Sequence, residues 1–150
     1  MIGLLQRVRS ASVDINGDRF AAIDMGLLVL FGVEAHDNSA SASALAQRIA
    51  NYRVFADDND KMNLSTLDCR HAILAVPQFT LVAETSRGRR PSFSHGASPE
   101  LGEKCFAAFV SALQALGVAT QTGVFGADMQ VNLCNDGPVT FWLQTPATKQ

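Results

Sequence analysis

The pair Asn16-Gly17 constrains the fold of this chain more than any other short segment. Apolar side chains lead into it at every second position, Ala11, Val13 and Ile15, with polar residues between them. This alternation indicates a strand with one buried face, and Asn-Gly supplies the two positive-φ residues of a type I′ turn. We therefore expect an antiparallel hairpin. The alternation changes phase near Arg9-Ser10, where we expect a β-bulge.

Three further segments have the composition of strands. Leu27–Phe31 is apolar at every position, which is typical of a central strand covered on both faces. Ile73–Val76 and Phe79–Val82 are predicted strands on either side of Pro77. Proline cannot donate to a ladder, so it should mark an edge, a bend or the end of a strand.

Two alternating stretches follow later in the chain, Met129–Leu133 and Val139–Leu143. Between them lies Asn135-Asp136-Gly137-Pro138, and Gly-Pro is a dipeptide that punctuates turns. The pattern predicts a second hairpin, with its turn at Asn135–Pro138.

Two segments have the period of a helix. Apolar residues recur every three or four positions from Ala42 to Ala50, after the capping-type residues Asp37–Ser39. The second helix is predicted to begin after Ser98, with Pro99 at its first position, and Gly117 closes it.

These elements predict an α+β fold, with a mostly antiparallel, barrel-like sheet as the core and two amphipathic helices. A length of 150 residues fits a single domain, 1–150. The formal net charge of -2 argues against a protein wrapped wholesale in nucleic acid, because such domains carry a strong basic excess. A local basic patch is compatible with that charge.

The sequence points to a reducing compartment and to no metal or cofactor. Its three cysteines show neither a CxxC pair nor the spacing of a zinc site, and we expect no metal ion and no cofactor. The first residues lack the pattern of a signal peptide, and the longest apolar run is far below the ~20 residues that cross a bilayer. We expect a cytoplasmic protein with no membrane contact.

Common catalytic motifs are missing from the sequence, and the three histidines are scattered through predicted loops. The densest charge lies at Arg87, Arg89 and Arg90, next to Gly88 and followed by Phe93. Guanidinium groups in an exposed loop can bind phosphates, and a phenyl ring can stack on a base. A solvated charged loop is the alternative interpretation.

Several ordered motifs resemble the D-aminoacyl-tRNA deacylase family along nearly the whole chain. They are Leu5-Gln6-Arg7-Val8 with Ala11-Ser12-Val13, Gly26–Leu30, Lys61–Ser65, Gln78–Leu81, Gly88–Phe93, Gly126–Val131 and Asn135–Thr140. The chain departs from the family pattern at Pro77, where the family usually has Ser. That change removes a hydroxyl and a backbone N–H beside the motif at Gln78.

The resemblance implies a homodimeric enzyme that hydrolyses the ester bond of D-aminoacyl-tRNA. It also implies a second substrate, glycine wrongly attached to alanine tRNA, Gly-tRNA(Ala). Catalysis is implied at Gln78, Phe79 and Thr80. Contact with tRNA is implied at the basic cluster, Arg87, Arg89 and Arg90.

Substrate binding and chiral selection are implied at Met129, Gly137 and Pro138. In the family, Gly137-Pro138 would have a cis peptide bond and reach into the active site of the partner subunit. Rejecting L esters a thousandfold takes about 4 kcal/mol, whereas an apolar pocket that senses one methylene gives only ~1 to 3 kcal/mol. We therefore expect a rigid backbone wall that excludes an L side chain and whose carbonyls accept from the substrate ammonium. Glycine would escape such a wall.

Hydrolysis also needs stabilisation of the developing oxyanion. Backbone N–H groups near Gln78 and Phe79 are candidates, at ~2.7 to 4 kcal/mol per donor. Thr80 either acts as the nucleophile or orients water; alternatively, the 2′-OH of the terminal ribose assists and no side chain is essential. Two other functions stay open, an RNA-binding module without catalysis and a dimeric small-molecule hydrolase with no RNA partner.

Overall fold

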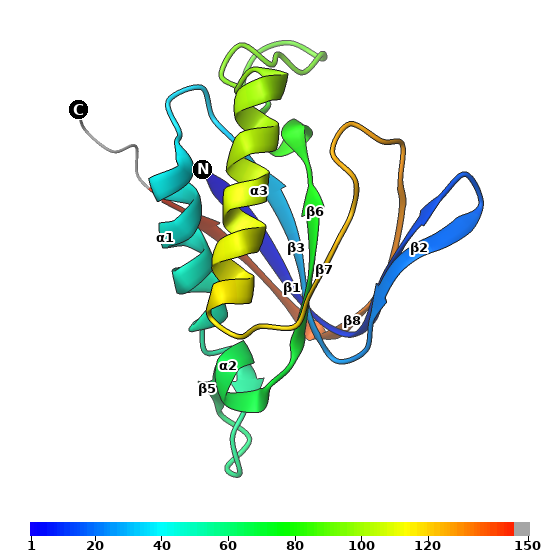
Figure 1. The fold of residues 1–150 in the computed structure, drawn as a ribbon, viewed down its shortest axis with the longest axis vertical. Helices are drawn as coiled ribbons and strands as arrows, with labels where there is room; N and C mark the ends of the chain where they lie inside the picture. The colour runs from blue at the N-terminus through cyan, green and yellow to red at the C-terminus, as the bar shows by residue number, and fades with distance from the viewer. Residues whose placement is uncertain (146–150) are drawn as a thin grey trace.

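The structure is a computed structural model and describes residues 1–145. Its elements are β1 (Ile2–Ile15), β2 (Asp18–Ile23), β3 (Gly26–Gly32), α1 (Ser39–Ala50), β4 (Phe55–Ala56), β5 (Met62–Leu64), α2 (Thr66–Cys69), β6 (Ala72–Pro77), the 3₁₀ helix η1 (Phe79–Val82), α3 (Pro99–Ala115), β7 (Thr120–Thr122) and β8 (Gln130–Gln144). The main sheet has the order β2-β1-β3-β6-β7, and β8 also pairs with β1 (Figure 1).

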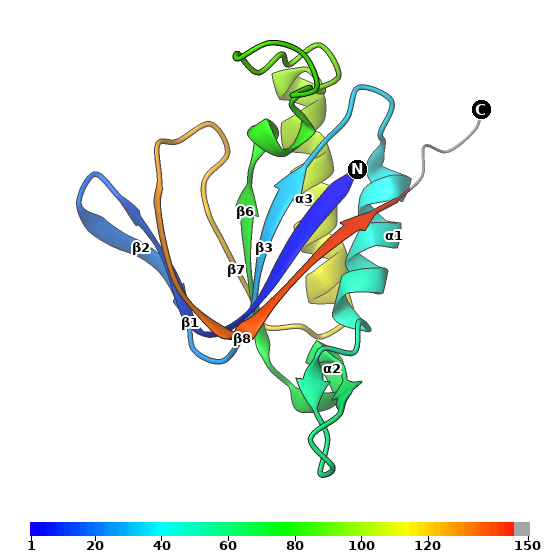
Figure 2. The ribbon, with the colours of Figure 1, turned by 180° about the vertical axis from the view of Figure 1, so that it is seen from behind.

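The main sheet is antiparallel around β1 and parallel from β3 through β6 to β7. Each parallel pair needs a crossover, and α1 and α3 lie within these crossovers on one face of the sheet (Figures 1 and 2). On the other side, the far halves of β1, β2 and β8 curl away from the helices (Figure 2). The predicted α+β class with a barrel-like sheet is confirmed; the short helix α2 adds to the two that were expected.

Strand β1 organises the sheet because both of its edges are paired. Along one edge it pairs first with β3 and then with β2, while β8 follows the other edge. The predicted hairpin is confirmed, since Asn16 and Gly17 have φ values of 52° and 83°. The bulge is confirmed too: the β1–β8 register shifts on both sides of Val8, and Arg9 is skipped before Ser10.

The second predicted hairpin is wrong. Residues 130–144 form one strand, β8, and both of its halves pair with β1 in the same direction. The chain has no reason to reverse there, because β1 is 14 residues long and offers a partner to each half in turn. The residues expected in a turn instead form a wide bulge inside β8.

Both predicted helices and the central strand are confirmed. The Asn38 side chain accepts from the N–H groups of Ala40 and Ser41 at the start of α1. Ser98 accepts from Leu101 at the start of α3, and Pro99 is its first residue. These contacts satisfy donors that a helix leaves free in its first turn.

The sheet separates two apolar cores. The larger core lies between the sheet and the helices, where Phe31 of β3 stacks on Phe109 of α3 with ring centroids 4.5 Å apart. The smaller core lies under the curled part of the sheet and includes Val13, Leu28 and Leu74. Strand β3 contributes to both, which explains why it is apolar at every position.

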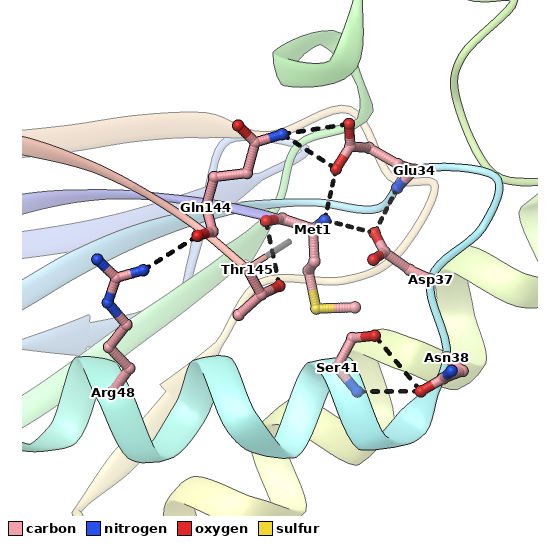
Figure 3. A network of polar contacts seen from close by, with 8 residues as sticks. All are labelled: Met1, Glu34, Asp37, Asn38, Ser41, Arg48, Gln144 and Thr145. Carbon is pink, nitrogen blue, oxygen red and sulfur yellow. Dashed lines mark hydrogen bonds and ion pairs between the residues drawn. The ribbon is translucent and has the colours of Figure 1, made fainter. Parts of the chain in front are cut away.

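A polar network joins the amino end of the chain to the β3–α1 loop (Figure 3). The α-ammonium of Met1 lies 2.5 Å from Glu34 Oε2 and 2.7 Å from Asp37 Oδ2. Gln144 of β8 donates to Glu34, and the main-chain N–H of Thr145 donates to the Met1 carbonyl. The network therefore fixes β1, β8 and the start of α1 to one another.

No helix within residues 1–145 is long and apolar enough to cross a membrane.

Candidate active site

Residues 79–82 form the 3₁₀ helix η1, so the prediction of a strand there is wrong. The pairing of β6 with β7 ends at Ala75, and the last contact of this segment with β3 is a 2.8 Å hydrogen bond from the Gln78 N–H to the Phe31 carbonyl. Beyond that point there is no neighbouring strand to accept or donate. The backbone therefore bonds locally, as in the bond from the Leu81 N–H to the Gln78 carbonyl.

Helix η1 presents two free donors next to Gln78. Within the described residues, the main-chain N–H groups of Phe79 and Thr80 donate to no protein acceptor, because they begin the helix and no side chain caps it. The Gln78 N–H is already engaged with Phe31, which corrects the expectation that it stabilises an oxyanion. The side-chain amide of Gln78 donates to the Thr80 hydroxyl.

Two cavities adjoin this segment and share Pro77, Gln78, Phe79 and Gly126. The larger, about 360 Å³, reaches between η1 and the start of α3 and is lined mainly by apolar groups, including Phe31, Phe93, Pro99 and Phe125. The smaller, about 240 Å³, lies towards β8 and is lined by Val76, Ala127, Asp128, Met129 and Val131 besides the shared residues. A ligand in two linked parts could place its junction at Gln78 and Phe79.

These cavities hold few groups capable of proton transfer. Within the described part of the chain, Asp128 is their one ionisable lining residue, and it is exposed at the surface. No histidine, cysteine or lysine lines either cavity. Protein side chains here offer a general base only at Asp128, and Thr80 has no basic partner.

Met129 lies where the resemblance implies substrate binding, in the lining of the smaller cavity. Its sulfur accepts from the Val124 N–H at 3.4 Å. Gly123 permits this packing, since a Cβ on Gly123 would lie 2.7 Å from the Met129 sulfur. The β7–β8 connection thus positions Met129 against η1.

The basic cluster lies in an exposed loop next to the larger cavity. Two main-chain hydrogen bonds between Glu84 and Ser92 close the base of this loop. Arg87, Arg89 and Arg90 are all exposed and form no ion pair within residues 1–145. We call residues 84–92 the arginine loop.

An aromatic pair links the arginine loop to η1. Phe93 follows the loop, lines the larger cavity, and lies 5.2 Å from Phe79 between ring centroids. Both rings are unusually open to solvent, Phe79 at 66% and Phe93 at 43%. Exposed aromatic faces beside cations are suited to binding a nucleobase.

Gly137 and Pro138 form the tip of the bulge in β8, and the bond between them is cis. Gly137 has a φ of 138°, and a Cβ there would lie 2.6 Å from the Val139 side chain, so only glycine fits. Arg7 holds the bulge from β1: its Nε donates to the Asp136 carbonyl at 3.1 Å, and its Nη1 donates to the Val54 carbonyl at 2.7 Å.

Within one chain, the structure does not bring Gly137-Pro138 to the cavities. The bulge lies opposite Arg7, which pairs with Leu27 on β3, whereas Gln78 follows Pro77, which pairs with Phe31. Four residues along a strand and three strand spacings separate the two places by roughly 20 Å. Neither cavity is lined by Gly137 or Pro138.

Two polar residues of the bulge, Arg7 and Asn135, were not singled out by the sequence analysis as having roles of their own. Asn135 was assigned to a turn, and Arg7 entered only as part of a motif. The signal was present in the pairing: a strand with an inserted Gly-Pro leaves carbonyls without ladder partners, and nearby donors must satisfy them.

One group of possible metal ligands occurs within residues 1–145, formed by Glu34, His36 and Asp37. The Met1 ammonium lies against both carboxylates and supplies a positive charge there. Burial disfavours the charged form of Glu34, but the hydrogen bond and charge of the Met1 ammonium outweigh it and lower the pKa of Glu34. This group belongs to the fold of the amino end, and neither cavity includes it.

Comparisons with known proteins agree with the resemblance. The model of the family described as D-Tyr-tRNA(Tyr) deacylase matches residues 4–144. A D-aminoacyl-tRNA deacylase of Proteus mirabilis (strain HI4320) is 54% identical over 144 residues, which cover 96% of this chain and 99% of the relative. One from Shewanella amazonensis (strain ATCC BAA-1098 / SB2B) has the same identity and coverage.

Two solved structures share the fold. A protein described as "c-Myc DNA Unwinding Element Binding Protein" superposes with a TM-score of 0.91 at 36% identity, covering 98% of this chain and 100% of its own. A probable eukaryotic D-amino acid tRNA deacylase superposes with a TM-score of 0.82 at 16% identity, covering 95% and 97%. The second likeness concerns the fold alone.

Proposed function

This chain belongs to the D-Tyr-tRNA(Tyr) deacylase family, and we propose that it removes D-amino acids from tRNA at the paired cavities beside η1. It is a D-aminoacyl-tRNA deacylase, a hydrolase of the ester bond between an amino acid and tRNA. Water adds to the ester carbonyl, the bond to the ribose oxygen breaks, and that oxygen takes up a proton. The products are the free amino acid and tRNA.

The ester carbonyl is placed against the start of η1. As the carbonyl carbon becomes tetrahedral, its oxygen gains negative charge, and the free N–H groups of Phe79 and Thr80 point out of the helix start. Each such donor is worth ~2.7 to 4 kcal/mol in a site that excludes water. Pro77 leaves both donors intact, since it precedes them.

The proton transfer is assigned to the substrate. Thr80 has no base beside it, and its hydroxyl already accepts from Gln78. The 2′-OH of the terminal ribose is adjacent to the ester in every aminoacyl-tRNA and can position the attacking water. This choice makes no protein side chain essential for the chemical step.

The wall that checks chirality comes from a second copy of the chain. Gly137-Pro138 lies roughly 20 Å from the cavities of its own chain, by the strand spacings of the sheet. The sheet face that turns away from α1 and α3 carries Leu4, Leu30 and Trp142 in adjacent register, with Trp142 51% exposed. A homodimer formed through this face would cover that apolar surface and bring each bulge towards the other copy's cavities.

Chirality is then read by exclusion. The wall of Gly137 and Pro138 occupies the place where an L side chain would go, while its carbonyls accept from the substrate ammonium. A D side chain points away from it. Glycine has no side chain to exclude, so Gly-tRNA(Ala) is a second substrate.

The arginine loop binds the acceptor end of the tRNA. Its guanidinium groups lie at the mouth of the larger cavity, next to the exposed rings of Phe79 and Phe93. Phosphates of the single-stranded end would meet the arginines, and the terminal base would meet the aromatic pair. A few local cations suffice for this, which fits a chain with a net charge of -2.

The observation that carries this proposal is the pair of free N–H groups at the junction of two linked cavities. The test incubates D-Tyr-tRNA, L-Tyr-tRNA and Gly-tRNA(Ala) separately with the protein and follows the release of free amino acid. We expect rapid release of D-Tyr and Gly and little release of L-Tyr. Survival of all three esters would favour an RNA-binding module, and equal loss of D and L esters would contradict chiral selection.

A further inference from the structure

The bulge in β8 leaves main-chain carbonyls that the β1–β8 ladder cannot satisfy. Gln6 pairs with Thr140 and Val8 pairs with Asn135, so four residues, 136–139, stand opposite Arg7 alone. Pro138 has no N–H to donate. Without a further donor, the carbonyls that face the bulge would lack partners.

The side chain of Asn135 supplies that donor. Its Nδ2 donates to the Arg7 carbonyl on β1 at 2.9 Å and to the Val139 carbonyl at 3.0 Å. A primary amide nitrogen carries two protons, so each carbonyl receives one. The amide thus connects the residue before the bulge, the residue after it, and the neighbouring strand.

The other contacts of the bulge act on one side only. The guanidinium groups of Arg7 and Arg9 both reach Asp136, which precedes Gly137. The far side, after Pro138, is tied back through the bond from Asn135 to the Val139 carbonyl. Gly137 and Pro138 themselves are exposed.

From this geometry we propose that Asn135 is a positioning residue for chiral selection: its amide sets the span of the bulge and so the place of the Gly137-Pro138 wall. The inference rests on the proposed function, in which that wall excludes L side chains. Loss of the amide frees the far end of the bulge. The wall then yields, and an L side chain gains room.

The test measures the ratio of D-Tyr-tRNA to L-Tyr-tRNA hydrolysis rates in Asn135→Ala and in Asn135→Asp. The second variant keeps the size of the side chain but replaces both donated protons by an acceptor. We expect the ratio to fall about tenfold or more in each, equivalent to about 1.4 kcal/mol of lost discrimination, with a faster reaction of the L ester. Asn135→Asp decides the outcome if Asn135→Ala does not fold.

Asn132→Ala is the matched control. Asn132 is also on β8 and donates to Asp14 at 2.9 Å, away from the bulge. We expect its D-to-L ratio to stay within about twofold of the original protein, so that loss of a β8 amide alone does not relax selection. An unchanged ratio in a folded Asn135 variant would overturn the assignment of Asn135. An original protein without selectivity would instead overturn the proposed function.

Discussion

The main-chain N–H of Gln78 donates a 2.8 Å hydrogen bond to the carbonyl of Phe31, where β6 leaves the sheet. This contact fixes which backbone donors remain for catalysis. Gln78 completes the sheet, whereas Phe79 and Thr80 begin η1 and keep their N–H groups free. The following predictions start from that division.

Phe79→Pro removes one proposed oxyanion donor, and Phe79→Ala serves as its matched control. Proline is tolerated at the first position of a helix, and Gln78 before it is not helical, with a φ of -142°. Both variants lose the phenyl ring, but only Phe79→Pro loses the N–H. We expect kcat for D-Tyr-tRNA to be lower by about 10²–10³-fold in Phe79→Pro than in Phe79→Ala. Equal rates in two folded variants would exclude the Phe79 N–H as a donor.

Thr80→Val tests the role of the hydroxyl. Because the ribose 2′-OH is assigned the proton transfer, we expect kcat to fall by far less than the ~10²–10⁴-fold that a proton-transferring group contributes. Single-turnover kinetics provide the measurement. If the hydroxyl were the nucleophile, Thr80→Val would lose orders of magnitude while Thr80→Ser retained activity.

The same assignment predicts the behaviour of a modified substrate. A D-Tyr-tRNA charged on the 3′ oxygen and ending in 2′-deoxyadenosine lacks the assisting hydroxyl, so its hydrolysis should slow by about 10²–10⁴-fold. Its binding should be unchanged. Full activity on this substrate would rule out assistance by the ribose.

The arginine loop should account for most of the salt-dependent affinity for tRNA. Replacing Arg87, Arg89 and Arg90 by Gln should weaken tRNA binding roughly tenfold or more at low salt and flatten its salt dependence by about 0.7 per lost phosphate contact. The control replaces Arg19, Arg48 and Arg53 by Gln, which changes the net charge equally on other elements. Equal weakening in both triple variants would show that overall charge, and not the arginine loop, attracts tRNA.

Glu34→Gln should destabilise the protein at neutral pH and much less in acid. The pKa of Glu34 is lowered in the folded protein, so its ion pair with the Met1 ammonium contributes fully above its ordinary pKa of about 4.3. That contribution is lost as the pH falls through the lower, folded value, because a protonated Glu34 resembles Gln. Urea unfolding from pH 7 to pH 3 should show the two proteins converging.

Glu103→Gln is the control for that experiment, since Glu103 is exposed on α3. Its free energy of unfolding should follow that of the original protein at each pH. A constant difference between Glu34→Gln and the original protein across the range would contradict the ion-pair assignment.

Periodicity and turn chemistry predicted the local elements well because they depend on neighbours in sequence. Asn16-Gly17, Asn38 and Ser98 each satisfy or orient backbone groups a few positions away, and the structure confirms each of them. These interactions are present before any tertiary contact forms. They can therefore be inferred from the residues alone.

The two wrong predictions both concerned segments whose conformation depends on distant strands. Phe79–Val82 alternates like a strand but lies beyond the end of β7, so no partner holds it extended. Asn135–Pro138 has the composition of a turn, but both of its flanks pair with β1. The bond from Asn135 to the Arg7 carbonyl joins residues 128 positions apart, and no local pattern reveals it.

The central claim is that one copy of the chain supplies the wall for the catalytic site of another. A crystal structure with a D-tyrosyl-adenosine analogue, in which an amide replaces the ester, tests it most directly. We expect the analogue carbonyl at about 2.7–3.1 Å from the Phe79 nitrogen. Its amino group should contact Gly137 or Pro138 of a second copy. An analogue bound beside Phe79 with the Gly137-Pro138 of every copy still roughly 20 Å away, the separation within one chain, would contradict the account.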